Sequence, residues 1–290
     1  MKILSDFNLA VDPDEVKQHL ERSEATIPTG DHKELLKQIF GLIDLTTLSE
    51  QDNIENVSQL CDKVNHQAEA FPSMSSVAAI CVYPELVAVV KEKLDNPLIS
   101  IASVGGGFPA SQTFTNIKVM EVEQAIEQGA EEIDIVMPVG KFLIDDLEYV
   151  DYEIHVIKER VGPVHLKVIL ETGSLKDHSL IRKASLLSIG AGADFIKTST
   201  GKISPGATPE AMVVMCCAIR DYYNRTGKKI GIKPAGGISD TQTALLYYHI
   251  VKEILGEEWL NRERFRIGAS RLANRILCEF FDQGPDFGYF

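Results

Sequence analysis

The chain of 290 residues carries 29 Lys and Arg against 42 Asp and Glu, which gives a formal net charge of −13. This acidity argues against a nucleic-acid backbone or an anionic membrane surface as the main partner, because both are themselves anionic. Five cysteines without a CxxC pair argue against a disulfide framework, and no window approaches the roughly 18 apolar residues of a membrane span. We therefore expect a cytoplasmic protein with no nucleic-acid or membrane partner.

Short apolar and β-branched runs alternate with helical patterns along the chain. The runs cover residues 41–48, 77–84, 98–107, 132–139, 165–172, 194–200, 229–237 and 264–270. Three of the helical patterns begin at Ser49, Thr208 and Ser239, whose side chains suit an N-cap, and the third pattern ends at Gly256. Eight such alternations favour the α/β class and a closed (β/α)8 TIM barrel, with a doubly wound open sheet as the alternative.

No low-complexity linker divides the chain, so we expect one barrel domain over residues 36–290. The charged residues 1–35, with a helix over residues 12–25, form an N-terminal helical extension that either caps the barrel or contacts another subunit. The glycine-rich aromatic end of the chain is expected to be a flexible tail.

Four consecutive predicted strands each carry one charged residue inside an apolar run. These residues are Asp134, Lys167, Lys197 and Lys233. Because alternate residues of a strand point to the same side, all four side chains can face the barrel interior. The active sites of TIM barrels lie at the carboxyl ends of the strands, which makes these residues candidates for catalysis.

Two lysines on adjacent strands have a definite electrostatic consequence. At a separation of roughly 5 Å and an effective dielectric of about 20, two ammonium groups repel each other by ~3 kcal/mol. This repulsion can lower the pKa of one lysine from about 10.4 towards 8. A neutral amine near neutral pH forms Schiff bases with carbonyl compounds. One of the lysines is therefore a candidate for this role, and Asp134 would partly offset the repulsion and offers a carboxylate for proton transfer.

Six segments, in order, resemble the signature segments of the deoxyribose-phosphate aldolases, which are class I aldolases with a TIM-barrel fold. The segments read "LIDLTTL", "VAAICVYP", "EIDIVMP", "LKVILETG", "ADFIKTSTGK" and "GIKPAGG". The resemblance implies reversible cleavage of 2-deoxy-D-ribose 5-phosphate to acetaldehyde and D-glyceraldehyde 3-phosphate, without a metal or other cofactor.

Carried onto this chain, the resemblance gives a catalytic role to three residues and a supporting role to three more. Lys197 matches the Schiff-base lysine, Lys233 the lysine that lowers its pKa, and Asp134 the acid and base that acts with a water molecule. The supporting residues are Lys167, Asp44 and Thr46.

Phosphate binding is expected in the loops after strands seven and eight, where TIM barrels commonly hold phosphate. The candidates are Gly201, Lys202, Gly236, Gly237, Ser239, Gly268 and Ser270. Family members often carry Arg at the position of Ser239 and Ser at the position of Arg271. Arg271 is therefore expected to supply the charge that Ser239 lacks.

Other features leave alternatives open. The seven histidines show no metal-binding spacing, so no metal site is expected. Tyr289 either reaches over the substrate, as a C-terminal tyrosine does in some family members, or lies in a loose tail. The alternative functions are a Schiff-base aldolase of different aldehyde specificity and a catalytically silent barrel that binds sugar phosphates. We expect a homo-oligomer.

Overall fold

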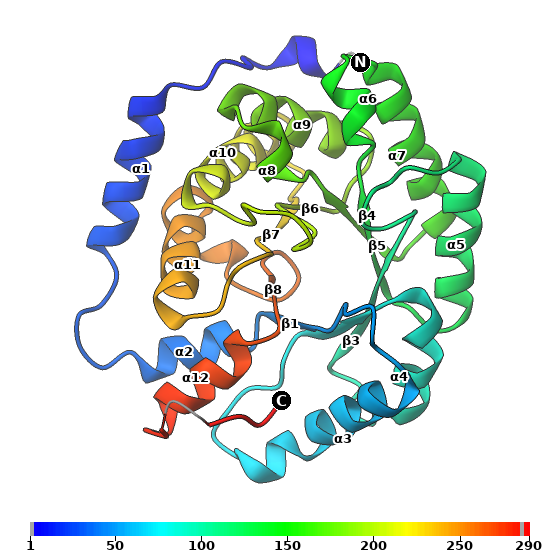
Figure 1. The fold of residues 1–290 in the computed structure, drawn as a ribbon. Helices are drawn as coiled ribbons and strands as arrows, with labels where there is room; N and C mark the ends of the chain where they lie inside the picture. Colours follow the sequence, from blue (N-terminus) through cyan, green and yellow to red (C-terminus); the bar gives the residue numbers. More distant parts are fainter. Residues whose placement is uncertain (1–2, 285–286) are drawn as a thin grey trace.

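Eight short parallel strands form one sheet that curls into a nearly closed barrel in the computed structural model, which describes residues 3–284 and 287–290 (Figure 1). The strands are β1 (Ile43–Thr46), β2 (Ala79–Val82), β3 (Ser100–Gly105), β4 (Glu132–Val136), β5 (His165–Ile169), β6 (Phe195–Lys197), β7 (Gly231–Lys233) and β8 (Ile267–Ala269). All eight expected strands are present, so the predicted TIM barrel is confirmed.

Helices surround the strands and connect each one to the next (Figure 1). The α-helices of the described residues are α1 (Pro13–Ala25), α2 (Lys33–Phe40), α3 (Ile54–Ala70), α4 (Val87–Lys93), α5 (Thr115–Glu127), α6 (Val139–Leu143), α7 (Leu147–Val161), α8 (Thr172–Leu175), α9 (His178–Gly190), α10 (Pro209–Thr226), α11 (Thr241–Leu255) and α12 (Leu272–Phe280). Short 3-10 helices occur at Leu4–Asp6, Pro84–Leu86 and Glu257–Trp259. None of these helices, in the part of the chain described, is long and apolar enough to cross a bilayer.

The sheet closes at a weak seam. Its strand order is β7-β6-β5-β4-β3-β2-β1-β8, and β1 pairs with both β2 and β8. Between β7 and β8 there is no continuous ladder, only isolated bridges from Ile232 to Phe265 and from Ala235 to Gly268. Pro234 lies between the two bridges and has no backbone N–H to donate. These bridges bring β7 and β8 side by side, so the barrel is nearly closed and the open-sheet alternative is excluded.

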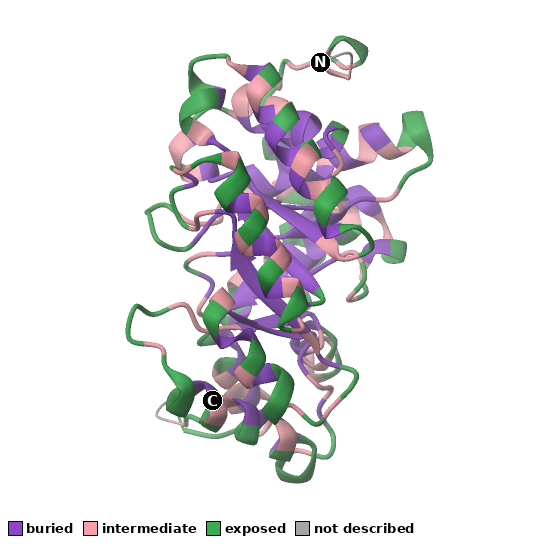
Figure 2. Ribbon diagram, turned by 90° about the vertical axis from the view of Figure 1, so that its right-hand side faces the viewer, coloured by how far each residue is buried: buried purple, intermediate pink, exposed green. Residues whose placement is uncertain are grey.

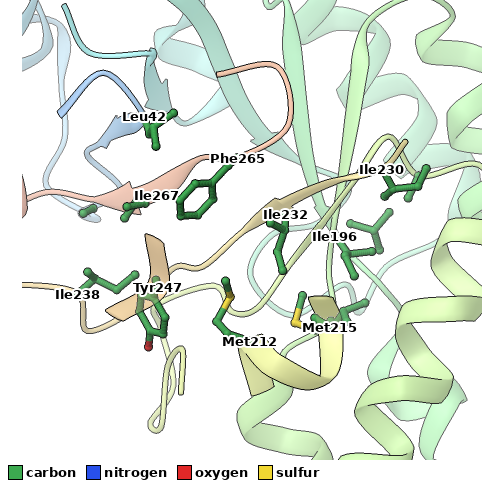
Figure 3. Packing of buried hydrophobic residues seen from close by; sticks show 14 of the residues in the cluster. Leu42, Ile196, Met212, Met215, Ile230, Ile232, Ile238, Tyr247, Phe265 and Ile267 are labelled. Carbon is green, nitrogen blue, oxygen red and sulfur yellow. The ribbon is translucent and has the colours of Figure 1, made fainter. Parts of the chain in front are cut away.

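The strands are buried on both faces because helices cover them outside and side chains fill them inside. Every residue of β4 is buried, for example, and Figure 2 shows the strands as buried while the helices expose their outer faces. Ile196 of β6 and Ile232 of β7 are register partners that point outward and lie near Met212 and Met215 of α10 (Figure 3). This apolar layer fixes strands β6 and β7 against their helices.

The helix caps agree with the sequence at one of three starts. Thr208 caps α10 as predicted, with its side chain accepting a hydrogen bond from the N–H of Ala211. The predictions for Ser49 and Ser239 are wrong. Asn53 caps α3 in a reciprocal capping box, and Asp240 caps α11. In both cases a residue that accepts from the N2 or N3 N–H lies further along the chain, and it sets the first turn.

The N-terminal segment lies on the outside of the barrel. Helix α1 runs along the outer side of α10 and α11 (Figure 1), with Val16 buried against them. The boundary expected at residue 35 falls inside α2, whose Leu36, Ile39 and Phe40 are fully buried. Helix α2 is thus packed as part of the barrel body.

Candidate active site

Charged side chains from six neighbouring parts of the sheet meet inside the barrel, although the interior of a protein normally excludes them. None of them is more than 3% exposed. They are Asp44 of β1, Glu132 and Asp134 of β4, Lys167 of β5, Lys197 of β6, Lys233 of β7 and Arg266 just before β8. The site therefore has to be understood as a network of compensated charges.

Asp134 lies at the centre of this network. Its Oδ2 accepts hydrogen bonds from Lys197 Nζ at 2.7 Å and from Lys233 Nζ at 2.8 Å, and its Oδ1 lies 3.2 Å from Lys167 Nζ. Strand register produces the arrangement, because Lys197 pairs with Lys233 and Asp134 pairs with Lys167 across adjacent strands. Two lysine Nζ atoms thus share one carboxylate oxygen.

A second pair of carboxylates extends the network towards the amino ends of the strands. Asp44 Oδ2 lies 2.5 Å from Lys233 Nζ, and its Oδ1 accepts from Arg266 Nη1 at 2.7 Å. Glu132 accepts from Arg266 Nη2 at 2.6 Å and from Lys167 Nζ. Sequence reasoning missed Glu132 and Arg266. Glu132 stands two residues before Asp134 and Arg266 stands between Phe265 and Ile267, so both carried the same signal of a charge within an apolar run.

The network sets the protonation state of each lysine. Burial is the main reason that the pKa of Lys197 is lowered; the Lys233 cation lowers it further, and Asp134 partly opposes both effects. Burial would also lower the pKa of Lys233, but Asp134 and Asp44 outweigh it and hold that pKa above its usual range. Lys197 is therefore the lysine inclined to be a neutral amine, and Lys233 remains a cation.

Asp134 is held as a carboxylate. Burial alone would raise its pKa, but the ammonium groups of Lys167, Lys197 and Lys233 outweigh burial and keep the pKa well below its usual range. Burial of Lys167 is likewise outweighed by Asp134 and Glu132, which raise its pKa. In the free enzyme a carboxylate thus lies within hydrogen-bond distance of the amine of Lys197.

A cavity of about 250 Å³ opens above Lys197 at the carboxyl ends of the strands. It brings together every residue expected to bind phosphate, together with Arg271, Thr46 and Lys197. Its lining residues are Thr46, Leu48, Lys197, Thr200, Gly201, Lys202, Ala235, Gly236, Gly237, Ile238, Ser239, Gly268, Ala269, Ser270 and Arg271. Asp44, Asp134, Lys167 and Lys233 do not line the cavity and are completely buried.

Two loops that line the cavity pack backbone against backbone. Gly236 has a φ of +86°, and a Cβ there would come within 3.2 Å of Gly201 Cα. Residue 236 must therefore be glycine if the β6 and β7 loops are to lie this close together. The buried Glu171 accepts hydrogen bonds from the N–H and hydroxyl of Thr200, which fixes the loop that carries Gly201.

The cationic side chains at the cavity have different surroundings. Lys202 Nζ donates to the carbonyl of Leu48, across the cavity from its own loop. Arg271 is exposed and lies on the same cavity as Ser239. The cavity therefore has an arginine on its β8 side, while position 239 on its β7 side carries only a hydroxyl.

Tyr289 does not line this cavity. Its hydroxyl donates to the carbonyl of Lys63 in α3, and its N–H donates to Asn274 Oδ1 in α12. Its ring packs edge-on against Phe71, so the end of the chain lies between α3 and α12 (Figure 1). In this structure Tyr289 therefore stabilises the outside of the barrel and has no contact with the site.

The comparisons with known proteins agree with the fold and with one class of enzyme. A family model described as DeoC/LacD family aldolase matches residues 26–249. The deoxyribose-phosphate aldolases of Homo sapiens and Mus musculus are each 43% identical to this chain over 257 residues, which is 85% of this chain and 80% of theirs.

Solved structures resemble the barrel at lower sequence identity. An aldolase called QR15 has a TM-score of 0.67 at 26% identity and covers 85% of this chain and 99% of its own. A tetrameric deoxyribose phosphate aldolase from Aeropyrum pernix has a TM-score of 0.63 at 23% identity and covers 94% of this chain and 99% of its own.

Proposed function

Because the chain belongs to the DeoC/LacD family of aldolases, we propose that it cleaves 2-deoxy-D-ribose 5-phosphate reversibly through a Schiff base on Lys197. The products are acetaldehyde and D-glyceraldehyde 3-phosphate. One observation carries the assignment: Lys197 is the lysine of the interior network that also lines the cavity of glycine loops. A substrate whose phosphate lies on those loops meets an amine, and the depressed pKa of Lys197 favours the neutral form that attacks carbonyl carbon.

The residues divide the proton transfers among them. Attack of the Lys197 amine on C1 gives a carbinolamine, which loses water to form an iminium ion. The iminium accepts the electron pair of the C3–C4 bond when the C4 hydroxyl loses its proton to Asp134 through a water molecule. D-glyceraldehyde 3-phosphate leaves, and an enamine stays on Lys197. Asp134 returns that proton, through the water molecule, to the enamine carbon, and hydrolysis of the resulting iminium releases acetaldehyde and restores the amine.

Lys233 is proposed to act through its positive charge, and three further residues support the site. Lys233 stays protonated beside Asp134 and Asp44, so its positive charge disfavours a second cation at Lys197 in the free enzyme. Lys167 lies beside both Asp44 and Asp134, and this contact helps to hold the Asp134 carboxylate in position. Thr46 lines the cavity at the end of β1, where it can contact the sugar.

The phosphate is proposed to lie against the loops after β6, β7 and β8. Backbone N–H groups of glycine-rich turns bind phosphate oxygens without charge, and Arg271 and Lys202 add positive charge at the same cavity. Since Ser239 and Arg271 line one cavity, the geometry supports the expectation that the arginine compensates for the missing charge at position 239.

Borohydride trapping tests the central assignment. The protein is incubated with acetaldehyde and sodium borohydride, and the modified peptide is identified by mass spectrometry. We expect one reduced adduct on Lys197 and none in Lys197→Met, with turnover of 2-deoxyribose 5-phosphate lost in the same variant. An adduct at another lysine rejects the role of Lys197. An adduct on Lys197 without turnover of this sugar rejects the substrate.

We also propose that the chain forms a homo-oligomer through an apolar surface near α5 and α6. Phe114, Met120 and Ile144 are each more than 60% exposed there, and Phe114 and Ile144 border the same cavity. Phe114→Asp is expected to lower the mass measured by light scattering, whereas Ile54→Asp, on the distant α3, leaves it unchanged. A wild-type monomer at micromolar concentration contradicts this assembly.

A cytoplasmic location is proposed on the basis of the thiols. All five cysteines are unpaired, as is usual in a reducing compartment. Cell fractionation with an antibody against the untagged protein tests this location, and recovery in a secretory compartment contradicts it.

A further inference from the structure

A second cluster of potential metal ligands lies outside the barrel, where α1 packs against α10 (Figure 1). Glu15 and His19 stand one turn apart on α1, and Cys217 faces them from α10. One ligand atom from each residue lies within 4.8 Å of the other two. None of the three residues lines the cavity above Lys197, so the cluster is separate from the proposed catalytic site.

The imidazole of His19 is oriented for ligation. Its Nδ1 lies 2.6 Å from Glu253 Oε2 of α11 and 2.9 Å from Arg22 Nη2. One ring nitrogen cannot both donate to the carboxylate and accept from the guanidinium; the shorter contact is to the carboxylate, which can only accept, so the site uses the tautomer with the ring proton on Nδ1. Nε2 then carries the free lone pair, and it lies 3.7 Å from Glu15 Oε1. Arg22 donates to the other oxygen of Glu253 at 2.7 Å and holds that carboxylate in place. Carboxylates commonly orient metal-binding histidines in this way.

The distances suit a small tetrahedral ion after a modest contraction. Zinc bond lengths of about 2.0 Å to oxygen and nitrogen and 2.3 Å to sulfur place neighbouring ligand atoms roughly 3.3–3.6 Å apart. The His19–Glu15 separation is already near this range. The separations that involve Cys217 Sγ are at most 4.8 Å, so they have to shorten by up to about 1 Å, through rotation of the Cys217 side chain and of the exposed Glu15 side chain. The cluster borders a cavity of about 180 Å³, which has room for a water molecule as a fourth ligand.

The neighbouring charges are nearly balanced without an ion. Arg220 Nη2 lies 3.8 Å from Glu15 Oε1, but its Nε is directed to Asp221 at 3.3 Å. Asp221 also accepts from Arg182 at 2.6 Å. Arg220 is one-third exposed, so its side chain can turn to solvent when a cation binds to Glu15.

We propose that Glu15, His19 and Cys217 bind one Zn²⁺ ion that fastens α1 to the barrel. The thiol of Cys217 releases its proton to solvent on binding, so a thiolate and a carboxylate balance the two charges of the ion. A thiolate together with an imidazole favours zinc over magnesium or calcium. The match to the DeoC/LacD family covers residues 26–249, so it includes α10 but not α1. The ion therefore joins a segment outside the family match to a helix within it. The role is structural and independent of the aldol reaction.

Zinc binding to the full-length protein, stripped of metal with a chelator, tests this site. Competition with a fluorescent zinc indicator is expected to give one site per chain, and zinc is expected to raise the melting temperature by a few degrees. Cys217→Ser and His19→Gln should each weaken binding by at least about 10- to 100-fold, which is the loss typical of a partner that only orients a ligand. Cys278→Ser, which removes a thiol from α12, should bind zinc as the wild type does.

Two further measurements on the wild-type protein test the zinc site without relying on a variant. Cobalt added to the stripped wild-type protein should produce a thiolate-to-cobalt charge-transfer band, and this result requires no variant to fold. Aldolase activity should be the same in the stripped and zinc-loaded protein. Absence of zinc binding, absence of the cobalt band, or unchanged affinity in Cys217→Ser overturns the proposal and leaves these residues as polar contacts between α1 and the barrel.

Discussion

Two buried lysines in this protein have opposite surroundings. Lys118 lies between α5 and α7, 1% exposed, and Lys197 lies in the barrel, 2% exposed. Lys118 donates to Glu153 at 2.5 Å and to Ser111 at 2.7 Å. Lys197 donates to Asp134, an oxygen of which also accepts from Lys233. Lys118 thus has a carboxylate to itself, whereas Lys197 shares one with Lys233.

The difference shows what makes a buried lysine reactive. Burial alone is common to both side chains. The carboxylate of Glu153 is further fixed by Thr115 and Tyr149, which makes the Lys118 pair a complete, closed network. Lys197 combines a shared carboxylate with a cavity that admits a ligand. A structural lysine and a chemical one therefore differ in their partners and their access, and not in their depth.

Substituting each lysine by Met gives the largest expected effects and separates the two roles. Lys197→Met should lower kcat/KM for the deoxyribose phosphate by at least about 10³-fold while the protein stays folded. Lys118→Met leaves Glu153 buried without its cation, so it should lower the free energy of unfolding by about 3–5 kcal/mol. Its activity per folded molecule should be unchanged. Urea unfolding measures the stability of both variants, and steady-state kinetics measure their activity. Loss of catalysis in folded Lys118→Met would contradict the purely structural role of Lys118.

Removing the second cation of the shared pair should change the pH profile. The Schiff base requires neutral Lys197, so activity rises as the pH passes upward through its pKa. Lys233→Met removes a cation that lowers this pKa, so the acidic limb of kcat/KM should move to higher pH. Activity near neutral pH should fall about 10- to 100-fold and recover in alkali.

The exposed Lys228 supplies the control for that experiment. Lys228→Met should leave the profile unchanged. A Lys233→Met profile that drops uniformly at every pH would instead assign Lys233 a role other than electrostatic control of Lys197.

Arg271 should have a smaller effect, confined to substrate binding. Arg271→Ser should raise KM for the phosphorylated sugar about five- to tenfold, the size expected for one exposed charge-assisted contact, and leave kcat nearly constant. Ser239→Arg in the same background should restore the KM. Kinetics with unphosphorylated deoxyribose serve as the control, because loss of a phosphate contact cannot alter them.

Tyr289 should have the smallest effect. Tyr289→Phe removes one hydrogen bond to the Lys63 carbonyl at the surface, so stability should fall by no more than about 1 kcal/mol. The kinetic constants should be those of the wild type. A fall in kcat would show that the C-terminal segment leaves α3 and reaches the substrate during turnover.

The sequence predicted the barrel because each strand is a short, almost wholly apolar run and a helical pattern separates each run from the next. Where the prediction failed, at Ser49 and Ser239, several residues in a row could cap the helix and only backbone geometry chose among them. Strand lengths were also overestimated, since the runs include the loops that line the site.

Lys197, Lys233 and Asp134 could be selected from the sequence because each interrupts an apolar run. The hydrogen bonds among these three residues could not be predicted from the sequence, because they depend on which strands are neighbours and on the register across the sheet. For the same reason the compensating pair Glu132 and Arg266, which lie 134 residues apart, was not recognised.

The seam between β7 and β8 is the part of the barrel wall with the fewest hydrogen bonds between strands. Everywhere else a continuous ladder joins the strands, whereas here isolated bridges flank Pro234, directly below the cavity. Thermal fluctuations should separate these two edges more readily than any other pair. The cavity residues that follow β7 and β8 would move with those two strands.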